Sequence, residues 1–112
     1  MRLCQQYSVP VVAGNGTLVF TNWQHGFTAV DPKSGEVLSD VSVFNLKKKE
    51  RAVSSPVMAG DLIIGTCGFT NEPKHAVAMK LKDGQLSEVW RIERNVPHIP
   101  CPIVIRDRVY LW

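Results

Sequence analysis

The chain has 112 residues, of which 45% are hydrophobic and 21% are charged, and its formal net charge is +3. These ordinary globular values exclude a disordered chain. The basic residues are dispersed except for a short run at 47–51, so they do not form the basic stripe that indicates a nucleic-acid interface. No apolar run approaches the ~20 residues that a membrane-spanning helix needs.

The beginning of the chain and its cysteines add two further exclusions. The first seven residues are too few and too polar for the apolar core of a signal peptide, so we expect any export signal of a parent protein to lie elsewhere. Cys4, Cys67 and Cys101 are an odd number without C-x-x-C spacing. This pattern predicts neither a disulfide framework nor a zinc ribbon.

Residues 8–53 predict four strands joined as two hairpins. The first pair covers 9–13 and 17–22, and Gly14-Asn15-Gly16 between them is the strongest local hairpin signal in the chain. A loop at 23–26 leads to the second pair, at 27–31 and 36–44. Asp31 before a proline, with Gly35 closing the segment, favours a turn between these strands.

Residues 54–99 repeat this arrangement after a crossing segment at 45–51. Strands are predicted at 54–59, 62–67, 75–81 and 87–93. The turns are Gly60-Asp61 and Lys82-Asp83-Gly84, and a polar loop covers 68–74. Residues 100–112 then match only the first hairpin of a unit. No segment shows a convincing helical period, so we expect an all-β protein.

The spacing of the copies sets the architecture. Pro10, Pro56 and Pro102 open equivalent segments and are 46 residues apart, and a weaker echo links Gly35 with Gly84. A four-stranded unit has two faces and cannot bury both alone, so units of this kind stack. We therefore predict about two and a half four-stranded antiparallel blades of a β-propeller with ~4 to 8 blades. Blade one is 8–53, blade two is 54–99, and 100–112 is the first hairpin of an incomplete third blade.

Ser8-Val9-Pro10-Val11-Val12, Ser54-Ser55-Pro56-Val57-Met58 and Ala29-Val30-Asp31-Pro32-Lys33-Ser34-Gly35 carry a family resemblance. The chain resembles the pyrroloquinoline-quinone-like repeats of quinoprotein dehydrogenases and of BamB-type outer-membrane assembly lipoproteins. Residues 91–102 also look like repeat proteins of planctomycete-type bacteria. The resemblance implies a tryptophan that docks between blades. Trp90 is its equivalent in the second unit, whereas Ser39 stands there in the first.

The resemblance favours a non-catalytic binding or scaffold module that mediates protein interaction in the bacterial periplasm or cell envelope. One alternative is part of a quinone-dependent dehydrogenase whose catalytic residues lie outside this chain. Another is a set of sensor repeats attached to a Ser/Thr kinase. Pyrroloquinoline quinone and Ca²⁺ are expected only under the dehydrogenase alternative, because the carboxylates Asp31, Asp61, Asp83 and Asp107 sit at turns, where backbone capping explains them.

Cys67, His75, His98 and Cys101 are the best metal-ligand candidates in the chain. Zinc sites usually show two tight ligand pairs, and these residues show only His98-x-x-Cys101, so we predict no metal site. Cysteine also serves as a small buried hydrophobe, which fits Cys101 in the place of Ser55. We find no catalytic residues.

The less repetitive loops are the candidates for recognition, because loops on a rigid scaffold commonly bind partners. The binding-loop candidates are Trp23, His25, Asn71 and His98. The half unit at 100–112 would leave unpaired strand edges, which are templates for another strand. We therefore also predict self-association through these edges.

Overall fold

The computed structural model describes residues 7–22, 26–44, 51–68 and 73–112. Throughout this described part the chain forms antiparallel β-strands and no helix, which confirms the all-β prediction. It follows that no helix there is long and apolar enough to cross a membrane. The strands are β1 (Val11–Val12), β2 (Leu18–Thr21), β3 (Gly26–Val30), β4 (Val37–Ser42), β5 (Val57–Ala59), β6 (Leu62–Cys67), β7 (His75–Lys82), β8 (Gln85–Ile92), β9 (Ile103–Ile105) and β10 (Arg108–Tyr110).

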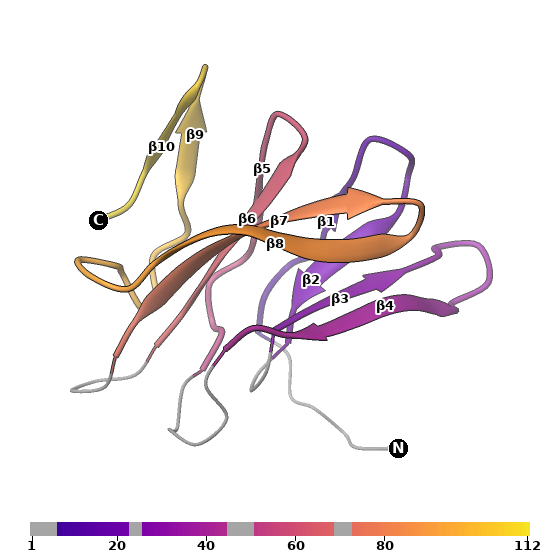
Figure 1. Ribbon diagram of the computed structural model, residues 1–112, viewed down its shortest axis with the longest axis horizontal. Helices are drawn as coiled ribbons and strands as arrows, with labels where there is room; N and C mark the ends of the chain where they lie inside the picture. The colour runs from indigo at the N-terminus through magenta and orange to yellow at the C-terminus, as the bar shows by residue number, and fades with distance from the viewer. Residues whose placement is uncertain (1–6, 23–25, 45–50, 69–72) are drawn as a thin grey trace.

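The strands form two four-stranded sheets and one hairpin. The first sheet has the order β1-β2-β3-β4, the second sheet has the order β5-β6-β7-β8, and β9 pairs with β10 in the third hairpin. In Figure 1 the hairpins β1–β2, β5–β6 and β9–β10 follow one another across the molecule. Each four-stranded sheet is a simple meander, because every strand pairs with its neighbour in sequence.

The two sheets share one register. The third and fourth strands of each sheet contain an irregularity at the same place, between Ala29 and Val30 in the first sheet and between Ala78 and Met79 in the second. Aligning the two irregularities shows which residues correspond. The corresponding sets, read across the four strands, are Val11, Val19, Ala29 and Ser39 in the first sheet and Val57, Ile64, Ala78 and Trp90 in the second.

The observed strands differ from the predicted ones mainly at their beginnings. β1 begins at Val11 and β5 at Val57, although strands were predicted from 9 and 54. In both repeats the proline at position 10 or 56 lacks an N–H donor, so strand pairing begins after it. β8 begins at Gln85, two residues before the predicted start, because Asp83 and Gly84 alone make the turn.

The φ angles of the turn residues show how two residues can connect the paired strands of these hairpins. Asp83 and Gly84 both have positive φ, at 52° and 76°, which is the pattern of a type I′ turn. In the β5–β6 turn Gly60 has a φ of 63°, and in the β9–β10 turn Arg106 has a φ of 56° at the corresponding place. A non-glycine residue is strained in this left-handed region, so the third hairpin folds with a less suitable turn residue than the second.

The two sheets pack on each other through one inter-sheet core. Both sheets contribute fully buried side chains, including Val19 and Phe27 from the first sheet and Ile63, Val77 and Met79 from the second. Fully burying an aliphatic or aromatic side chain of this kind contributes about 1.5–3 kcal/mol. The core therefore holds the two sheets against each other. It also packs the strands within each sheet.

Gly65 permits the closest approach between the sheets. A Cβ at this position would lie 2.7 Å from Cζ of Phe27 and 2.7 Å from Cγ2 of Thr21, distances that side chains do not reach. Both neighbours are fully buried and belong to the first sheet. The Phe27 ring also lies 5.7 Å, centroid to centroid, from the ring of Phe44. Any side chain at residue 65 would therefore push the sheets apart.

A repeated hydrogen bond links each unit to the next. The N–H of Val9 donates to Oγ of Ser55 at 2.8 Å, and the N–H of Ser55 donates to Sγ of Cys101 at 3.2 Å. Both bonds join residues that are 46 positions apart. The first unit is thus hydrogen-bonded to the second in the same way as the second unit is hydrogen-bonded to the third hairpin. The units stack in one direction, each through one face onto the opposite face of the next.

Candidate functional site

The outer face of the third hairpin is the clearest exposed apolar surface of the described chain. Ile103 pairs with Tyr110 and Ile105 pairs with Arg108, so these residues share one face of the hairpin. Ile103, Ile105 and Tyr110 are 38%, 55% and 40% exposed. We call these three residues the open face. Val104 and Val109 form the other face and are half-buried.

The corresponding residues of the first unit are covered. Val11, Ala13 and Val19 take the places of Ile103, Ile105 and Tyr110. Ala13 and Val19 belong to the inter-sheet core, and Val11 packs against it. The open face is therefore the face on which, in the first unit, the next sheet stacks. Isolated exposed apolar residues are common, but a set on one face of a strand pair marks a surface suited to association.

Trp90 lies on β8, the last strand of the second sheet. It pairs in register with Ala78, as Ser39 pairs with Ala29, so Trp90 and Ser39 hold corresponding places. Oγ of Ser39 accepts a hydrogen bond from the N–H of Leu86 in the second sheet and is buried. Trp90 is half-buried, and Ile92, two residues further along β8, is 41% exposed.

The outer face of the first sheet has a different character. Nδ2 of Asn22 donates to Oγ1 of Thr28 at 2.9 Å, and the Thr28 hydroxyl donates to Oδ1 of Asp40 at 2.7 Å. Val77 and Arg91 occupy the corresponding places of Thr28 and Asp40 in the second sheet. The first sheet thus presents a connected polar network where the second sheet buries a valine in the inter-sheet core.

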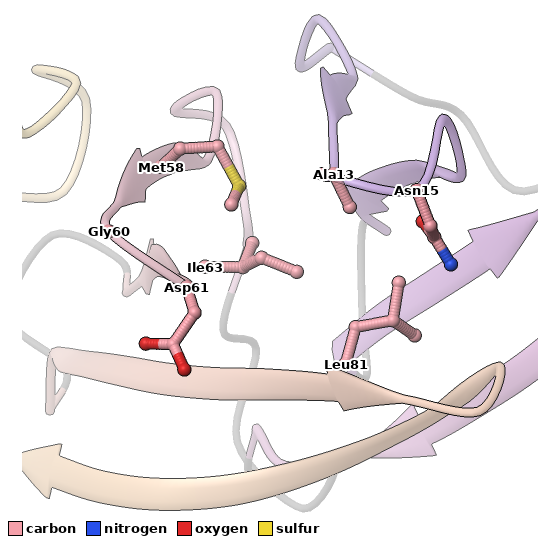
Figure 2. Close-up of a pocket in the computed structure, with 8 residues that line it drawn as sticks. Ala13, Asn15, Met58, Gly60, Asp61, Ile63 and Leu81 are labelled. Atoms are coloured by element: carbon pink, nitrogen blue, oxygen red, sulfur yellow. The ribbon is translucent and has the colours of Figure 1, made fainter.

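A pocket of about 330 Å³ lies between the two sheets at their turns. Figure 2 shows the β1–β2 loop with Asn15 on one side and the β5–β6 hairpin with Met58 and Asp61 on the other. Two of its polar side chains have partners elsewhere in the chain. Oδ1 of Asn15 accepts from the N–H of Thr17, and Asp61 lies 3.0 Å from Nζ of Lys80. The hydrogen bond that Lys80 donates to Asp61, together with the positive charge of Lys80, lowers the pKa of the Asp61 carboxyl.

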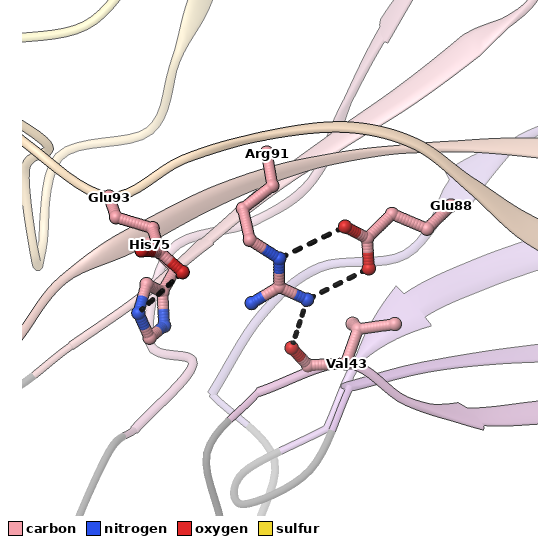
Figure 3. Close-up of polar contacts among 5 residues, drawn as sticks. All are labelled: Val43, His75, Glu88, Arg91 and Glu93. Carbon is pink, nitrogen blue, oxygen red and sulfur yellow. Dashed lines mark hydrogen bonds and ion pairs between the residues drawn. The ribbon is translucent and has the colours of Figure 1, made fainter.

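Arg91 is the main charged link between the sheets. Its guanidinium donates two hydrogen bonds to the Glu88 carboxylate, at 2.9 and 2.8 Å, and one to the Val43 carbonyl at 2.7 Å (Figure 3). The hydrogen bond from Arg91 lowers the pKa of Glu88. A bidentate pair fixes the plane of the guanidinium, so the contact to Val43 positions β8 against the first sheet.

The metal-ligand candidates are only partly brought together. Cys67 and His75 are register partners on β6 and β7 and are both buried. Nε2 of His75 lies 3.8 Å from Oε1 of Glu93. Cys101 is exposed and is the acceptor of the Ser55 N–H bond. Among the described residues, no three His, Cys, Asp or Glu side chains group as metal ligands would.

His98 follows β8 in a connecting segment and is half-buried. Desolvation lowers its pKa, and the positive charges of Lys74 and Arg51 lower it further. The Arg51 backbone exchanges two hydrogen bonds with Gly68, at 2.9 and 3.1 Å. The positive charges of Lys74 and Arg51 therefore act on His98.

The remaining predicted residues fall into two groups. Trp23, His25 and Asn71 lie outside the described residues. Of the prolines that open the repeats, Pro56 and Pro102 are buried, whereas Pro10 is exposed. Gly35 and Gly84 both have positive φ in their turns, at 75° and 76°.

Sequence reasoning did not single out the open face. The alternation of Ile103, Val104 and Ile105 could have indicated a strand with two apolar sides, but the sequence does not say which side a neighbour covers. No family model, curated protein or solved structure matches the chain.

Proposed function

We propose that this chain is a non-catalytic binding or scaffold module made of stacked β-propeller blades of the quinoprotein-like type. Its partners are proteins, including further copies of itself. The observation that carries the proposal is the open face, because Ile103, Ile105 and Tyr110 are exposed where the first unit is covered. The family resemblance supports the propeller assignment and a setting in the bacterial periplasm or cell envelope.

The repeated stacking contact supports a propeller. The bonds from Val9 to Ser55 and from Ser55 to Cys101 relate successive units in the same way. Stacking of one face onto the opposite face is head-to-tail, and such an arrangement forms a ring when the rotation per unit closes. Meander sheets of four strands are the blades of such rings.

The charged groups support a structural and binding role. Arg91 joins Glu88 to the first sheet, Lys80 pairs with Asp61, and Cys101 accepts a backbone hydrogen bond. Each of these contacts joins strands or units. In contrast, the apolar side chains of the open face are available to a partner.

Two measurements test this proposal. Sedimentation velocity of the purified chain over a wide concentration range should show reversible association, and a stable monomer at high concentration would count against self-association. Isothermal titration of the full-length parent protein with pyrroloquinoline quinone and Ca²⁺ should show no stoichiometric uptake. Tight uptake at one equivalent would replace the scaffold proposal with the dehydrogenase alternative.

A further inference from the structure

We propose that Asn15, in the turn between β1 and β2, is a site of self-modification. The backbone nitrogen of Gly16 attacks the side-chain amide of Asn15, ammonia leaves, and residue 15 becomes aspartate or isoaspartate. The turn has both of its flanking strands within the described chain. The modification does not depend on the proposed binding function.

Asn15 has a neighbour in sequence that the other asparagines lack. The chain has five asparagines, and only Asn15 precedes a glycine, whereas the others precede Trp23, Leu46, Glu72 and Val96. A side chain on the following residue hinders the approach of its backbone nitrogen to the asparagine amide, and glycine permits close backbone approach. Asn15 is therefore the asparagine at which this attack meets the least steric hindrance.

The turn leaves space for the reaction. Gly14, Asn15 and Gly16 are all exposed. A Cβ at Gly14 or at Gly16 would meet nothing within 4 Å, and Gly16 has a φ of 87°. The backbone at the tip of this turn consequently has room to rearrange, and water reaches the Asn15 amide.

The N–H of Thr17 is placed to assist the attack. It donates a hydrogen bond to Oδ1 of Asn15 at 3.1 Å. Attack on Cγ moves an electron pair onto this oxygen, and a positioned N–H donor stabilises the negative charge that develops there. The turn thus polarises the same carbonyl that the Gly16 nitrogen has to attack.

The reaction balances with water as the only added reactant. A solvent base takes the proton of the Gly16 nitrogen, and the nitrogen electron pair forms a bond to Cγ of Asn15. The electron pair on Oδ1 then returns, the bond from Cγ to the side-chain nitrogen breaks, and that nitrogen takes up a proton and leaves as ammonia. Water opens the resulting succinimide ring at either carbonyl carbon. Opening at the side-chain carbonyl gives aspartate, and opening at the backbone carbonyl gives isoaspartate.

One hydrogen bond of the turn opposes the attack. The N–H of Gly16 donates to the carbonyl of Ala13 at 2.8 Å, and this bond has to open before the nitrogen reaches Cγ of Asn15. Local opening of an exposed loop costs much less free energy than global unfolding. We therefore expect Asn15 to react from a locally opened turn while both sheets stay folded.

The products would change the first hairpin and the pocket between the sheets. In isoaspartate the Cβ of residue 15 becomes part of the backbone, which lengthens the turn. Ala13 and Thr17, which are buried, are joined across this turn by a backbone hydrogen bond of 2.8 Å. Both products also place a new carboxylate on the side of the pocket that faces the β5–β6 hairpin with Asp61 (Figure 2).

The test follows the purified full chain during incubation in mildly alkaline buffer. Ion-exchange chromatography should resolve a species whose net charge is lower by one than the formal +3, and ammonia should be released in step with it. Tandem mass spectrometry of tryptic peptides assigns the modified residue. A methyltransferase that acts only on isoaspartyl carboxylates verifies the isoaspartate.

Asn95 is the internal reference for the rate. It is exposed and has a positive φ of 54°, but Val96 follows it. Conversion at Asn15 should be at least roughly tenfold faster than at Asn95, because valine hinders the attacking nitrogen. Equal rates at the two asparagines would overturn the proposal.

Two matched alanine variants test the role of Gly16. Gly16→Ala should slow the conversion of Asn15 by roughly tenfold, because the methyl group lies on the residue that supplies the nitrogen. Gly14→Ala adds a methyl group on the other side of Asn15, in open space, and should leave the rate within roughly twofold. The same rate in both variants would contradict attack by the Gly16 nitrogen. Far-UV circular dichroism verifies that each variant folds.

The product ratio and the pH dependence identify the chemical route. The rate should rise with pH, because a base has to remove the proton of the Gly16 nitrogen. A succinimide yields isoaspartate together with aspartate, whereas direct hydrolysis of the Asn15 amide by water yields aspartate alone. A product that contains only aspartate would therefore overturn the proposal.

Discussion

The first and second sheets have the same strand order, the same register and an irregularity at the same place. They differ in the side chains that their corresponding faces carry. The second sheet places Gly65 and Val77 against the first sheet. The first sheet has Phe20 and Thr28 at the corresponding positions, and Thr28 belongs to a polar network. The comparison shows that the backbone pairing is the same in both sheets, whereas the side chains decide whether a face packs on another sheet or carries a polar network.

The largest predicted effect comes from closing the space at Gly65. Gly65→Ala should lower the free energy of unfolding by about 2–3 kcal/mol, because the new Cβ overlaps the Phe27 ring and Thr21. Urea denaturation followed by fluorescence measures this loss. Phe27→Leu in the same chain should recover part of it, which a double-mutant cycle would detect.

Gly14→Ala is the matched control for Gly65. A Cβ at Gly14 meets nothing within 4 Å, so the change should be neutral within about 0.5 kcal/mol. Equal effects at the two glycines would remove the distinction between a stacked position and an open one.

The next effect tests the polar face of the first sheet. Thr28→Val should cost about 1–2 kcal/mol, because it removes the hydroxyl that bonds both Asn22 and Asp40. Thr28→Ser keeps the hydroxyl and should retain most of the stability. A valine variant as stable as the native chain in thermal unfolding would mean that the network does not distinguish the sheets.

Substitutions in two hairpin turns should change the free energy of unfolding by smaller amounts and in opposite directions. Arg106→Gly should stabilise the chain by about 1 kcal/mol, because it relieves a positive φ at a non-glycine residue. Gly60→Ala, at the corresponding turn, should destabilise it by about 1 kcal/mol or somewhat more. Changes of the same sign at both turns, measured by chemical denaturation, would contradict the equivalence of the two hairpins.

The smallest effect is a pH dependence near His98. Desolvation, Lys74 and Arg51 hold the His98 pKa below its unfolded value of about 6.5. The unfolded chain therefore binds more protons in this range, so the free energy of unfolding should fall as the pH is lowered through about 6.5. His98→Gln should reduce this dependence. An unchanged pH profile in the variant would show that His98 does not cause it.

Much of the backbone follows from local sequence. The prolines at 10, 56 and 102 set the period, and dipeptides such as Gly60-Asp61 and Asp83-Gly84 set the turns between register-paired strands. These signals act over a few residues, because a turn or a missing N–H is decided locally. The four-stranded antiparallel sheets could therefore be predicted without coordinates.

Which face of each sheet is covered by a neighbour could not be predicted from local sequence. Gly65 gains its role from Phe27 in another sheet, and Ile103 and Tyr110 are exposed only because no described residue lies over them as the second sheet lies over the first unit. Such contacts join residues far apart in sequence. Spacing alone placed His98 near Cys101, and only the structure shows that Cys67 and His75 are register partners on neighbouring strands.

The most direct test of head-to-tail stacking is the contact between Phe27 and Gly65. In a nuclear Overhauser spectrum of the folded chain, the ring protons of Phe27 should show strong cross-peaks to a Gly65 Hα. That Hα resonance should also be displaced by the ring current. A folded chain whose β2–β3 and β6–β7 pairings are intact but which lacks this cross-peak would contradict the stacking of the two sheets.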